Sequence, residues 1–303
     1  MILVTSPSSN PYVNIAIEHY LLEHLHCGEN RYVFFYINQP CVVVGRNQSI
    51  YREVNFEFLK NDFTKICRRI SGGGTVYQDE GNLCFSFIES AANHKTGNYL
   101  YFNQCIIDAL QSIGYNVKPD ERNNLLLNGK KISGNAQFTN RRNIISHGTL
   151  LYNSNLNNLR ASLRENIFDI ETKAVASVRS SVMNLCETAN YFVNAEELQK
   201  VLIEKLPIAS NYELSKEESS EIEKLAQNFE SAQWVYGRSP DTVLRFKNTE
   251  VSIKQGRIER LKIDGHAIEG WNGVSFTYSE LTREFAKRKM QTHPLMQLFE
   301  ARF

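Results

Sequence analysis

The most informative stretch of the chain, at residues 68–77, reads Arg68-Arg69-Ile70-Ser71-Gly72-Gly73-Gly74-Thr75-Val76-Tyr77. Three adjacent glycines follow a strand-like segment, and because glycine has no Cβ and tolerates positive φ, their N–H groups can turn toward a ligand. Two arginines before the glycines and two β-branched residues after them add cations and a strand-turn-strand frame. The loop predicts a site for a carboxylate or a phosphate. An ordinary tight turn is the alternative, because the spacing matches neither the Walker nor the Rossmann pattern.

Strand-like runs surround this loop on both sides. The runs at residues 32–37 and 41–44 predict a pair of strands, and the runs at 65–67 and 83–88 place the loop inside a sheet. Further strands are predicted at residues 115–117, 125–127, 132–138 and 144–152, and helices at residues 10–27 and 98–113. Strands with occasional helices, without a regular βαβ alternation, favour an α+β domain on a mixed or antiparallel sheet.

The pattern changes in the last third of the chain. Residues 196–206 and 216–229 are predicted helices, followed by short strands at 243–246, 251–254 and 258–263 and a helix at 278–287. A chain of 303 residues is long enough for one large core and a small second domain. We therefore expect a main domain over residues 1–230 and a small α+β accessory domain over residues 231–303.

Composition excludes several classes of protein. The 34 basic and 33 acidic side chains leave a net charge of +1, which gives no reason to expect a nucleic-acid partner. The apolar runs are too short to span a bilayer and no secretory signal pattern is present, so we expect a cytoplasmic protein without a membrane partner. Six single cysteines without a Cys-x-x-Cys pair and seven scattered histidines predict neither a disulfide framework nor a metal site.

A second glycine-containing segment, Gly129-Lys130-Lys131-Ile132-Ser133-Gly134-Asn135-Ala136-Gln137, precedes a strand-like run that contains His147. Together with the first loop it resembles the lipoate-protein ligase A family of the biotin/lipoate protein ligase superfamily. The matching segments, in chain order, are Val44-Gly45-Arg46-Asn47-Gln48, the Arg-Arg-x-Ser-Gly-Gly-Gly loop, Asp79-Glu80-Gly81-Asn82, Arg122-Asn123, Lys131-Ile132-Ser133-Gly134-x-Ala136, His147-Gly148-Thr149-Leu150-Leu151 and Ser177-Val178-Arg179-Ser180-x-Val182-x-Asn184-Leu185. An ordered set of this size is far more specific than one run of glycines.

The resemblance implies a fold and a reaction. Residues 1–230 would be a biotin-ligase-like catalytic domain, related to class II synthetases and built on a mixed sheet, with the small C-terminal domain that ligases of this family carry. Such ligases activate free lipoate with ATP to lipoyl-adenylate. They then pass the lipoyl group to a lysine of a lipoyl domain, in 2-oxoacid dehydrogenase complexes or in the glycine cleavage H protein. ATP, lipoate and Mg²⁺ held on the phosphates are the small molecules this implies.

The resemblance also implies roles for individual residues. Lys131 would be the catalytic cation that touches both the acyl carboxylate and the α-phosphate, with a solvated turn lysine, as expected for Lys130, as the alternative. The nucleotide-binding residues would be Arg69, Gly74, Thr75, Val76 and Tyr77. Gly72 and Gly73 would admit the acyl chain, His147 would line its pocket or hold a strand hydrogen bond, and Arg179, in a mobile adenylate-binding loop, would reach a phosphate. No residue is expected to ligate a metal, and Arg68 is expected to form an ion pair at the surface.

Two positions depart from the family pattern. The family commonly has His-Asp after the tyrosine, where this chain has Gln78-Asp79, which keeps a hydrogen-bonding side chain but not a titrating one. The Arg-Asn-Asp of many members appears as Arg122-Asn123-Asn124, which removes a carboxylate and with it a candidate Mg²⁺ ligand.

Rival functions remain open at this point. An octanoyltransferase or lipoyl amidotransferase would use a cysteine nucleophile, but residues 117–130 contain none. An ATP-independent transferase that accepts preformed lipoyl-adenylate would share the fold and the lysine. A catalytically silent lipoate-binding protein would account for Gln78 and Asn124, although the retained Lys131, Arg69 and glycine loop argue against it.

Overall fold

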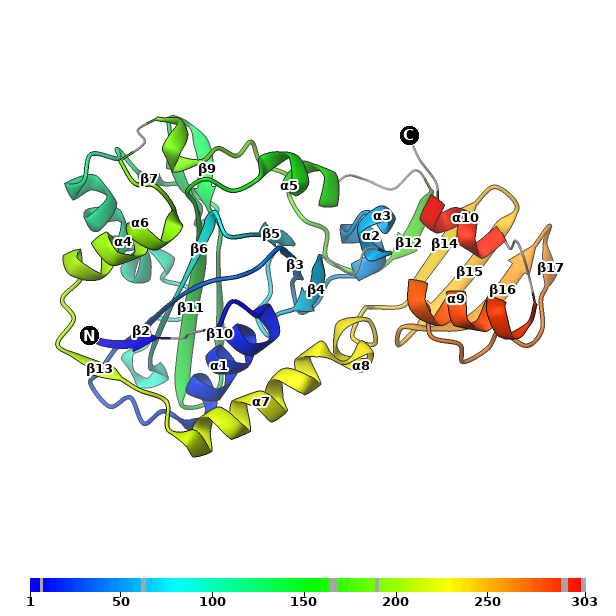
Figure 1. Cartoon of the computed structure of the whole chain (residues 1–303), viewed down its shortest axis with the longest axis horizontal. Coiled ribbons are helices and arrows are strands. Elements are labelled where there is room, and N and C mark those ends of the chain that lie inside the picture. The colour runs from blue at the N-terminus through cyan, green and yellow to red at the C-terminus, as the bar shows by residue number, and fades with distance from the viewer. Residues whose placement is uncertain (6–7, 61–63, 164–167, 189–190, 290–293, 301–303) are drawn as a thin grey trace.

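The structure is a computed structural model that describes residues 1–5, 8–60, 64–163, 168–188, 191–289 and 294–300. Its larger part is built on a six-stranded sheet. A smaller part, at the end of the molecule away from the N-terminus, holds a five-stranded sheet with the helices α9 (Tyr278–Lys287) and α10 (Pro294–Glu300) (Figure 1). Within the described residues, no helix combines the length and the apolar character needed to cross a membrane.

The six-stranded sheet has the order β10-β11-β6-β2-β1-β13. Its strands are β1 (Ile2–Thr5), β2 (Tyr32–Ile37), β6 (Asn82–Ser90), β10 (Asn135–Thr139), β11 (Asn143–Leu151) and β13 (Ser210–Tyr212). β1 is parallel to both β2 and β13, whereas the other neighbouring pairs are antiparallel. The sheet is therefore mixed, as the sequence predicts.

Helices cover both faces of this sheet. α1 (Pro11–His24) packs with Phe34 and Tyr36 on one face, and α7 (Lys216–Glu230) packs against α1. α4 (Tyr99–Ser112) and α6 (Ala195–Lys205) pack with Val33 and Phe35 on the other face. Because alternate residues of a strand point to opposite faces, β2 is buried on both sides and its sequence is apolar throughout.

Local signals set the helix bounds. The Asn10 side chain accepts a hydrogen bond from the N–H of Tyr12 at the start of α1, and Asn98 caps α4 in the same way. α1 ends at His24, three residues before the predicted end at Cys27, because Leu25 is already extended. The remaining helices are α2 (Ile50–Glu53), α3 (Phe56–Leu59), α5 (Leu156–Ser162) and α8 (Ala232–Val235), with 3₁₀ turns η1 (Ala91–Asn93) and η2 (Leu185–Glu187).

A three-stranded sheet carries the glycine loop. Its order is β4-β3-β5, with β3 (Cys41–Val44), β4 (Lys65–Arg68) and β5 (Val76–Gln78), and the loop joins β4 to β5 as predicted. The predicted pairing of residues 32–37 with 41–44 is wrong. Both edges of β2 are occupied by β1 and β6, so the chain leaves the main sheet at Asn38 and β3 joins the second sheet.

A second three-stranded sheet carries Lys131. It consists of β7 (Lys118–Pro119), β8 (Leu125–Leu127) and β9 (Lys130–Ser133). The single strand predicted at residues 132–138 is broken at Gly134 into β9 and β10, which belong to different sheets. No strand forms at residues 115–117, where the N–H of Val117 instead turns back to the carbonyl of Tyr115.

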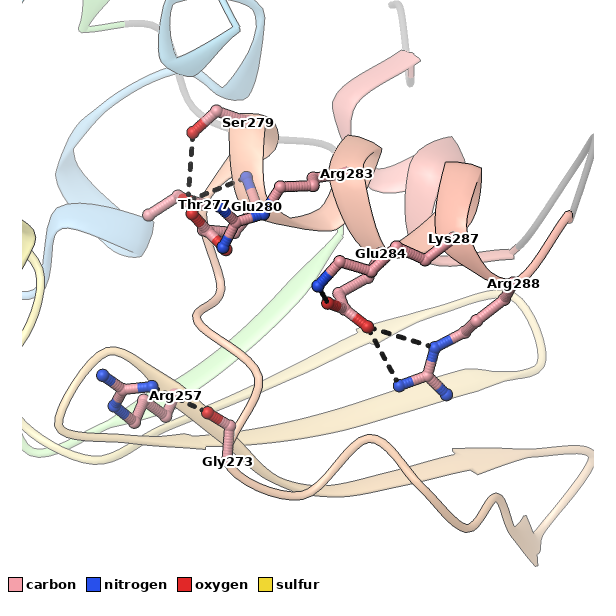
Figure 2. A network of polar contacts seen from close by, with 9 residues as sticks. All are labelled: Arg257, Gly273, Thr277, Ser279, Glu280, Arg283, Glu284, Lys287 and Arg288. Atoms are coloured by element: carbon pink, nitrogen blue, oxygen red, sulfur yellow. Dashed lines mark hydrogen bonds and ion pairs between the residues drawn. The ribbon is translucent and has the colours of Figure 1, made fainter.

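The five-stranded sheet of the smaller part draws one strand from far upstream. Its order is β12-β14-β15-β16-β17, formed by β12 (Asp169–Thr172), β14 (Thr242–Phe246), β15 (Thr249–Lys254), β16 (Arg257–Ile263) and β17 (His266–Ala267). Helix α9 presents a polar face with ion pairs from Glu280 to Arg283 and from Glu284 to Lys287 and Arg288 (Figure 2). These exposed pairs keep that face of the helix in water, while Leu281 and Phe285 are buried.

Arg68 joins the two parts. Its side chain is 0% exposed, which contradicts the expected ion pair at the surface. Nε and Nη2 donate to the carbonyl oxygen of Val235 (3.0 and 2.8 Å), Nη1 donates to those of Gly45 and Gln48 (2.9 and 2.7 Å), and Nη2 also donates to Ser239 Oγ (2.9 Å). Burial lowers the pKa of this guanidinium to about 10. This charge has no carboxylate partner among the described residues and is held by these four acceptors, three of them backbone carbonyls.

Candidate active site

Two cavities meet at Lys131. The larger, of about 630 Å³, extends toward α5 and β12 and is lined by Arg52, Tyr77, Arg160 and Arg179 among others. The smaller, of about 530 Å³, extends toward α1 and β2 and is lined by Ile15, Glu18, Tyr36, Gln78 and His147 among others. Lys131, Thr75, Val76 and Gly134 line both. One ammonium group therefore faces two adjoining spaces of different character, one flanked by three arginines and one that reaches buried side chains of α1 and β2.

The backbone fixes the position of Lys131. The Lys131 N–H donates to the carbonyl of Ser181 (2.9 Å), and the N–H of Met183 donates to the carbonyl of Lys131 (3.1 Å). Strand β9 is thus bound to the segment that follows Arg179. A Cβ at residue 134 would lie 3.0 Å from Lys131 Nζ, and glycine at that position leaves room for the ammonium. Burial lowers the pKa of Lys131 below the ordinary 10.5, and Asp120 opposes that shift.

Asp120 is a site residue that sequence reasoning missed. The N–H groups of Arg122 and Asn124 and the Asn124 side chain all donate to its carboxylate, each at 2.8 Å. Burial would raise the pKa of Asp120, but these hydrogen bonds and the charge of Lys131 hold it below its ordinary value. Asn124 therefore orients a carboxylate from the preceding turn toward the lysine. The available signal was the aspartate itself, because Asp often starts a turn by accepting from the N–H two residues further on, here that of Arg122.

Arg69 holds the glycine loop in shape. Nη2 donates to the carbonyl oxygens of Gly72 and Gly74 (2.6 and 2.7 Å), and Nη1 donates to that of Val43 (3.1 Å). Nε donates to Ser71 Oγ (3.0 Å). Four of its five N–H groups are thus bound to the loop and its neighbouring strand. Gly73 has φ +85° and packs closely on Arg69, whereas Gly72 is among the lining residues of neither cavity.

A buried chain of hydrogen bonds runs from Arg69 through Ser71 and His147 to Glu18. Ser71 Oγ is 2.7 Å from His147 Nε2, and His147 Nδ1 is 3.0 Å from Glu18 Oε2. Because Ser71 accepts from Arg69, its hydroxyl hydrogen is free to donate to His147 Nε2, which leaves Nδ1–H to donate to Glu18. Burial would raise the pKa of Glu18, but His147, Ser86 and Tyr36 hold it below its ordinary value. His147 is thereby oriented along the wall of the smaller cavity.

Gln48 connects the loop to the segment around Ser177. Its Oε1 accepts from the N–H of Gly45 (2.9 Å) and from Thr75 Oγ1 (2.8 Å), while Nε2 donates to Ser177 Oγ (2.9 Å). Ser177 Oγ also accepts from the N–H of Thr75 (2.9 Å) and donates to Glu53, which accepts from the Ser177 N–H as well. The segment at residues 175–177 is consequently bound between the two cavities.

The predicted site residues fall into three groups. Lys131, Thr75 and Val76 line both cavities, Gly73, Gly74, Arg69 and His147 line the smaller one, and Tyr77 and the exposed Arg179 line the larger one. Gly72 supports the loop from outside. Glu18, Gln48 and Glu53 were not predicted, because their partners His147, Thr75 and Ser177 lie far away in the sequence and only the fold brings them near.

The fold and the site place two cavities beside a single ammonium group, an arrangement suited to an enzyme. Residues 10–207 match the family model described as "Lipoyl protein ligase A/B catalytic domain". The chain is 36% identical over 269 residues to "Lipoate--protein ligase 1" of Staphylococcus aureus, covering 85% of this chain and 82% of that protein. It is 33% identical over 272 residues to "Lipoate-protein ligase LplJ" of Bacillus subtilis, with the same coverage. The chain therefore belongs to the lipoyl protein ligase A/B family and is a ligase, which confirms the resemblance.

Solved structures share the fold. The TM-score is 0.66 to a structure described as "lipoate-protein ligase A bound with ATP", at 24% identity, covering 78% of this chain and 98% of that one. It is 0.65 to a putative lipoate protein ligase from T. acidophilum with bound lipoic acid, at 23% identity and the same coverage. The expected α+β fold is confirmed.

Proposed function

We propose that this site activates free lipoate with ATP and then transfers the lipoyl group to a lysine of a lipoyl domain. The observation that carries the proposal is the position of Lys131 at the junction of the two cavities. The smaller cavity suits an acyl chain, because it runs from Lys131 to the buried side chains of Ile15 and Val43. The larger cavity suits ATP, because Arg52, Arg160 and Arg179 line it.

In the first step, a carboxylate oxygen of lipoate attacks the α-phosphorus of ATP. An acyl–O–P bond forms, and the bond to pyrophosphate breaks, with pyrophosphate leaving. Negative charge gathers where the carboxylate meets the α-phosphate, and a preorganised cation stabilises that charge. Lys131 lies at this junction, and a compact ammonium can follow the charge from one oxygen to another.

In the second step, the amine of an acceptor lysine attacks the acyl carbon of lipoyl-adenylate. A C–N bond forms, the C–O bond to the phosphate breaks, and AMP leaves while the amine loses a proton. AMP carries away negative charge, which the same ammonium stabilises. A relative structure is described as a bi-partite lipoate protein ligase and its E2 lipoyl domain from Thermoplasma acidophilum. We propose lipoyl domains of 2-oxoacid dehydrogenase complexes, or the glycine cleavage H protein, as acceptors, in the cytoplasm.

The domain division and the metal belong to the same proposal. Residues 231–303, joined by β12, form an accessory unit beside the catalytic part at residues 1–230. Mg²⁺ would arrive on the phosphates of ATP and offset their charge. The chain offers it no ready-made cage, because groups of three or more His, Cys, Asp or Glu side chains suited to a metal are absent from the described part of the chain.

The cysteines argue against a thioester-forming transferase. All six lie in the described part of the chain, and none of them lines either cavity. Burial raises the pKa of the Cys41 and Cys84 thiols well above the ordinary value, the opposite of what a thiolate nucleophile requires.

The test is to mix the protein with ATP and lipoate and to measure pyrophosphate and lipoyl-adenylate, then to add an acceptor lipoyl domain and measure AMP and added lipoyl mass. The ligase releases pyrophosphate before acceptor is added. An ATP-independent transferase lipoylates the acceptor only from supplied lipoyl-adenylate. A silent binding protein does neither, and either of those outcomes would refute the proposal.

A further inference from the structure

The inner end of the smaller cavity is built on three buried amides. Asn14, Asn38 and Gln78 are 0%, 1% and 5% exposed and come from α1, the end of β2 and β5. Asn38 and Gln78 line the cavity together with the apolar side chains of Ile15 and Val43. Asn38 and Gln78 therefore place amide groups beside apolar side chains in this wall.

This wall is distant from the lysine. Thr149, which lines the cavity beside Lys131, lies opposite Cys84 on β6, and Cys84 lies opposite Tyr36 on β2. Two strand spacings, roughly 10 Å, separate Thr149 from Tyr36 across the sheet. A carboxylate at Lys131 would thus send the other end of a medium-length acyl chain toward Tyr36 and the amides.

The hydrogen bonds determine which way each amide points. Asn14 Nδ2 donates to the carbonyl oxygen of Ser8 (2.9 Å), which can only accept, so the NH₂ group of Asn14 is identified. The same nitrogen donates to Asn38 Oδ1 (2.7 Å). Asn38 Nδ2 must then be the atom that donates to Gln78 Oε1 (2.7 Å), which also accepts from the Cys41 thiol (3.7 Å).

The atom left over is Gln78 Nε2. It carries two N–H groups, and no acceptor for them is found among the residues that the structure describes. A ligand that covers this donor without accepting from it leaves the donor unpaired, which is costly, so a ligand that fills this space binds better when one of its atoms accepts a hydrogen bond. A saturated hydrocarbon displaces water from Nε2 and accepts no hydrogen bond in its place. A sulfur atom is a weak acceptor that also packs against apolar side chains.

We propose that Gln78 is a specificity-determining residue that donates through Nε2 to sulfur at the far end of the acyl chain. The enzyme consequently selects an acid that ends in a 1,2-dithiolane ring over a hydrocarbon acid of equal length and shape. This inference rests on the proposed function, because it takes the smaller cavity as the acyl site.

The test compares lipoate with 5-cyclopentylpentanoate, which has the same ring size and chain but CH₂ groups in place of both sulfurs. Pyrophosphate release gives kcat/KM for each acid. We expect the wild-type enzyme to prefer lipoate by about tenfold or more, corresponding to about 1.4 kcal/mol. Gln78→Met keeps the length of the side chain and removes the N–H groups, and should bring the ratio to within about threefold of one. Gln78→Leu serves as a second variant of similar volume.

The matched control is Cys41→Ala. It removes the thiol that donates to the same Oε1, lines no cavity and leaves Nε2 in place, so it should keep the wild-type ratio. A wild-type ratio near one, or a ratio that persists in a folded Gln78→Met or Gln78→Leu variant, would overturn the assignment. Dissociation constants of the two acids are measured by calorimetry in parallel. Absence of pyrophosphate would then count against the proposed function alone, while the binding ratio still decides the role of Gln78.

Discussion

Lys131 lies between the two cavities, and its replacement is the most direct test of whether one ammonium group serves both steps of the proposed reaction. We expect Lys131→Met to lower both adenylation and transfer by at least ~100-fold, a loss of ~2.7 kcal/mol in transition-state stabilisation. Lys130→Met is the matched control, since Lys130 is exposed and lines neither cavity. Pyrophosphate release and lipoyl transfer from supplied lipoyl-adenylate are measured separately. Full transfer by Lys131→Met would restrict the lysine to the first step.

The pH dependence of lipoate binding reports on the same group. Burial lowers the pKa of Lys131 below the ordinary 10.5. The protonated form attracts the carboxylate, so affinity is complete below the pKa of the free enzyme and falls as the pH rises through it. Calorimetry from about pH 8 to about pH 11 should show this decline beginning before 10.5 in the wild type and not at all in Lys131→Met. An identical decline in both proteins would assign it to another group.

Gly72 and Gly73 are adjacent and not equivalent. Gly73 has φ +85°, and a Cβ there would lie 3.1 Å from Arg69 Nη2, whereas a Cβ on Gly72 would meet nothing within 4 Å. We expect Gly73→Val to abolish lipoate binding with a fall of only a few °C in melting temperature, and Gly72→Ala to change neither. Calorimetry and thermal melts measure the two effects. Loss of folding in Gly73→Val without a separate binding defect would support an ordinary tight turn.

Among the helices and strands, those with a local signal in the sequence were predicted. α1 and α4 were predicted because each carries its own capping asparagine, and β2 and β3 because each is a run of apolar, β-prone residues. The pairing of β2 with β3 was wrong because pairing depends on which strands compete for an edge. β1, β12 and β13 escaped prediction because strands of three or four residues become stable only beside their distant partners.

In the candidate site, too, the sequence predicts what neighbouring residues form and not what distant residues form together. The glycine loop and Lys131 were predicted from contiguous segments, whereas the Glu18–His147 pair joins residues 129 positions apart. The segment around Arg179 was predicted as a mobile loop that binds adenylate. Its anchor, Ser177 on Glu53 and Gln48, follows only from the fold.

Glu53 should control how often this segment opens. Glu53→Ala removes the acceptor of the Ser177 N–H and hydroxyl, and hydrogen bonds to a charged group contribute roughly 1.5–3 kcal/mol each. We expect tryptic cleavage after Arg179 to become at least about tenfold faster, because cleavage follows the population of the open form. Glu53→Gln keeps an acceptor oxygen, and its cleavage rate should lie between those of the wild type and Glu53→Ala. Equal cleavage rates in Glu53→Ala and the wild type, measured by mass spectrometry, would show that Glu53 does not hold the segment.

In the whole molecule, packing contacts join the residues on the two sides of the boundary that the sequence pattern predicts near residue 231. Phe56 packs against Phe168 and against Phe276 and Phe299 of the smaller part, in one continuous hydrophobic cluster. β12 leaves the catalytic part to pair with β14. None of these contacts has a local signal in the sequence, so the attachment of the two parts could not be predicted from it.

This attachment predicts that the chain unfolds as one unit. Ser239 Oγ accepts from Arg68 Nη2 (2.9 Å) and from the N–H of Ile50 (3.2 Å), so Ser239→Ala leaves two buried donors on the catalytic side without an acceptor. Calorimetry should record one transition in the wild type and one in Ser239→Ala, shifted down by about 3 °C or more, as a loss of at least about 2 kcal/mol implies. The exposed Ser279→Ala on α9 (Figure 2) is the control, with a change below about 0.5 kcal/mol. Two resolved transitions, with Ser239→Ala lowering only one, would mean that the two parts unfold independently and that Arg68 stabilises its own side alone.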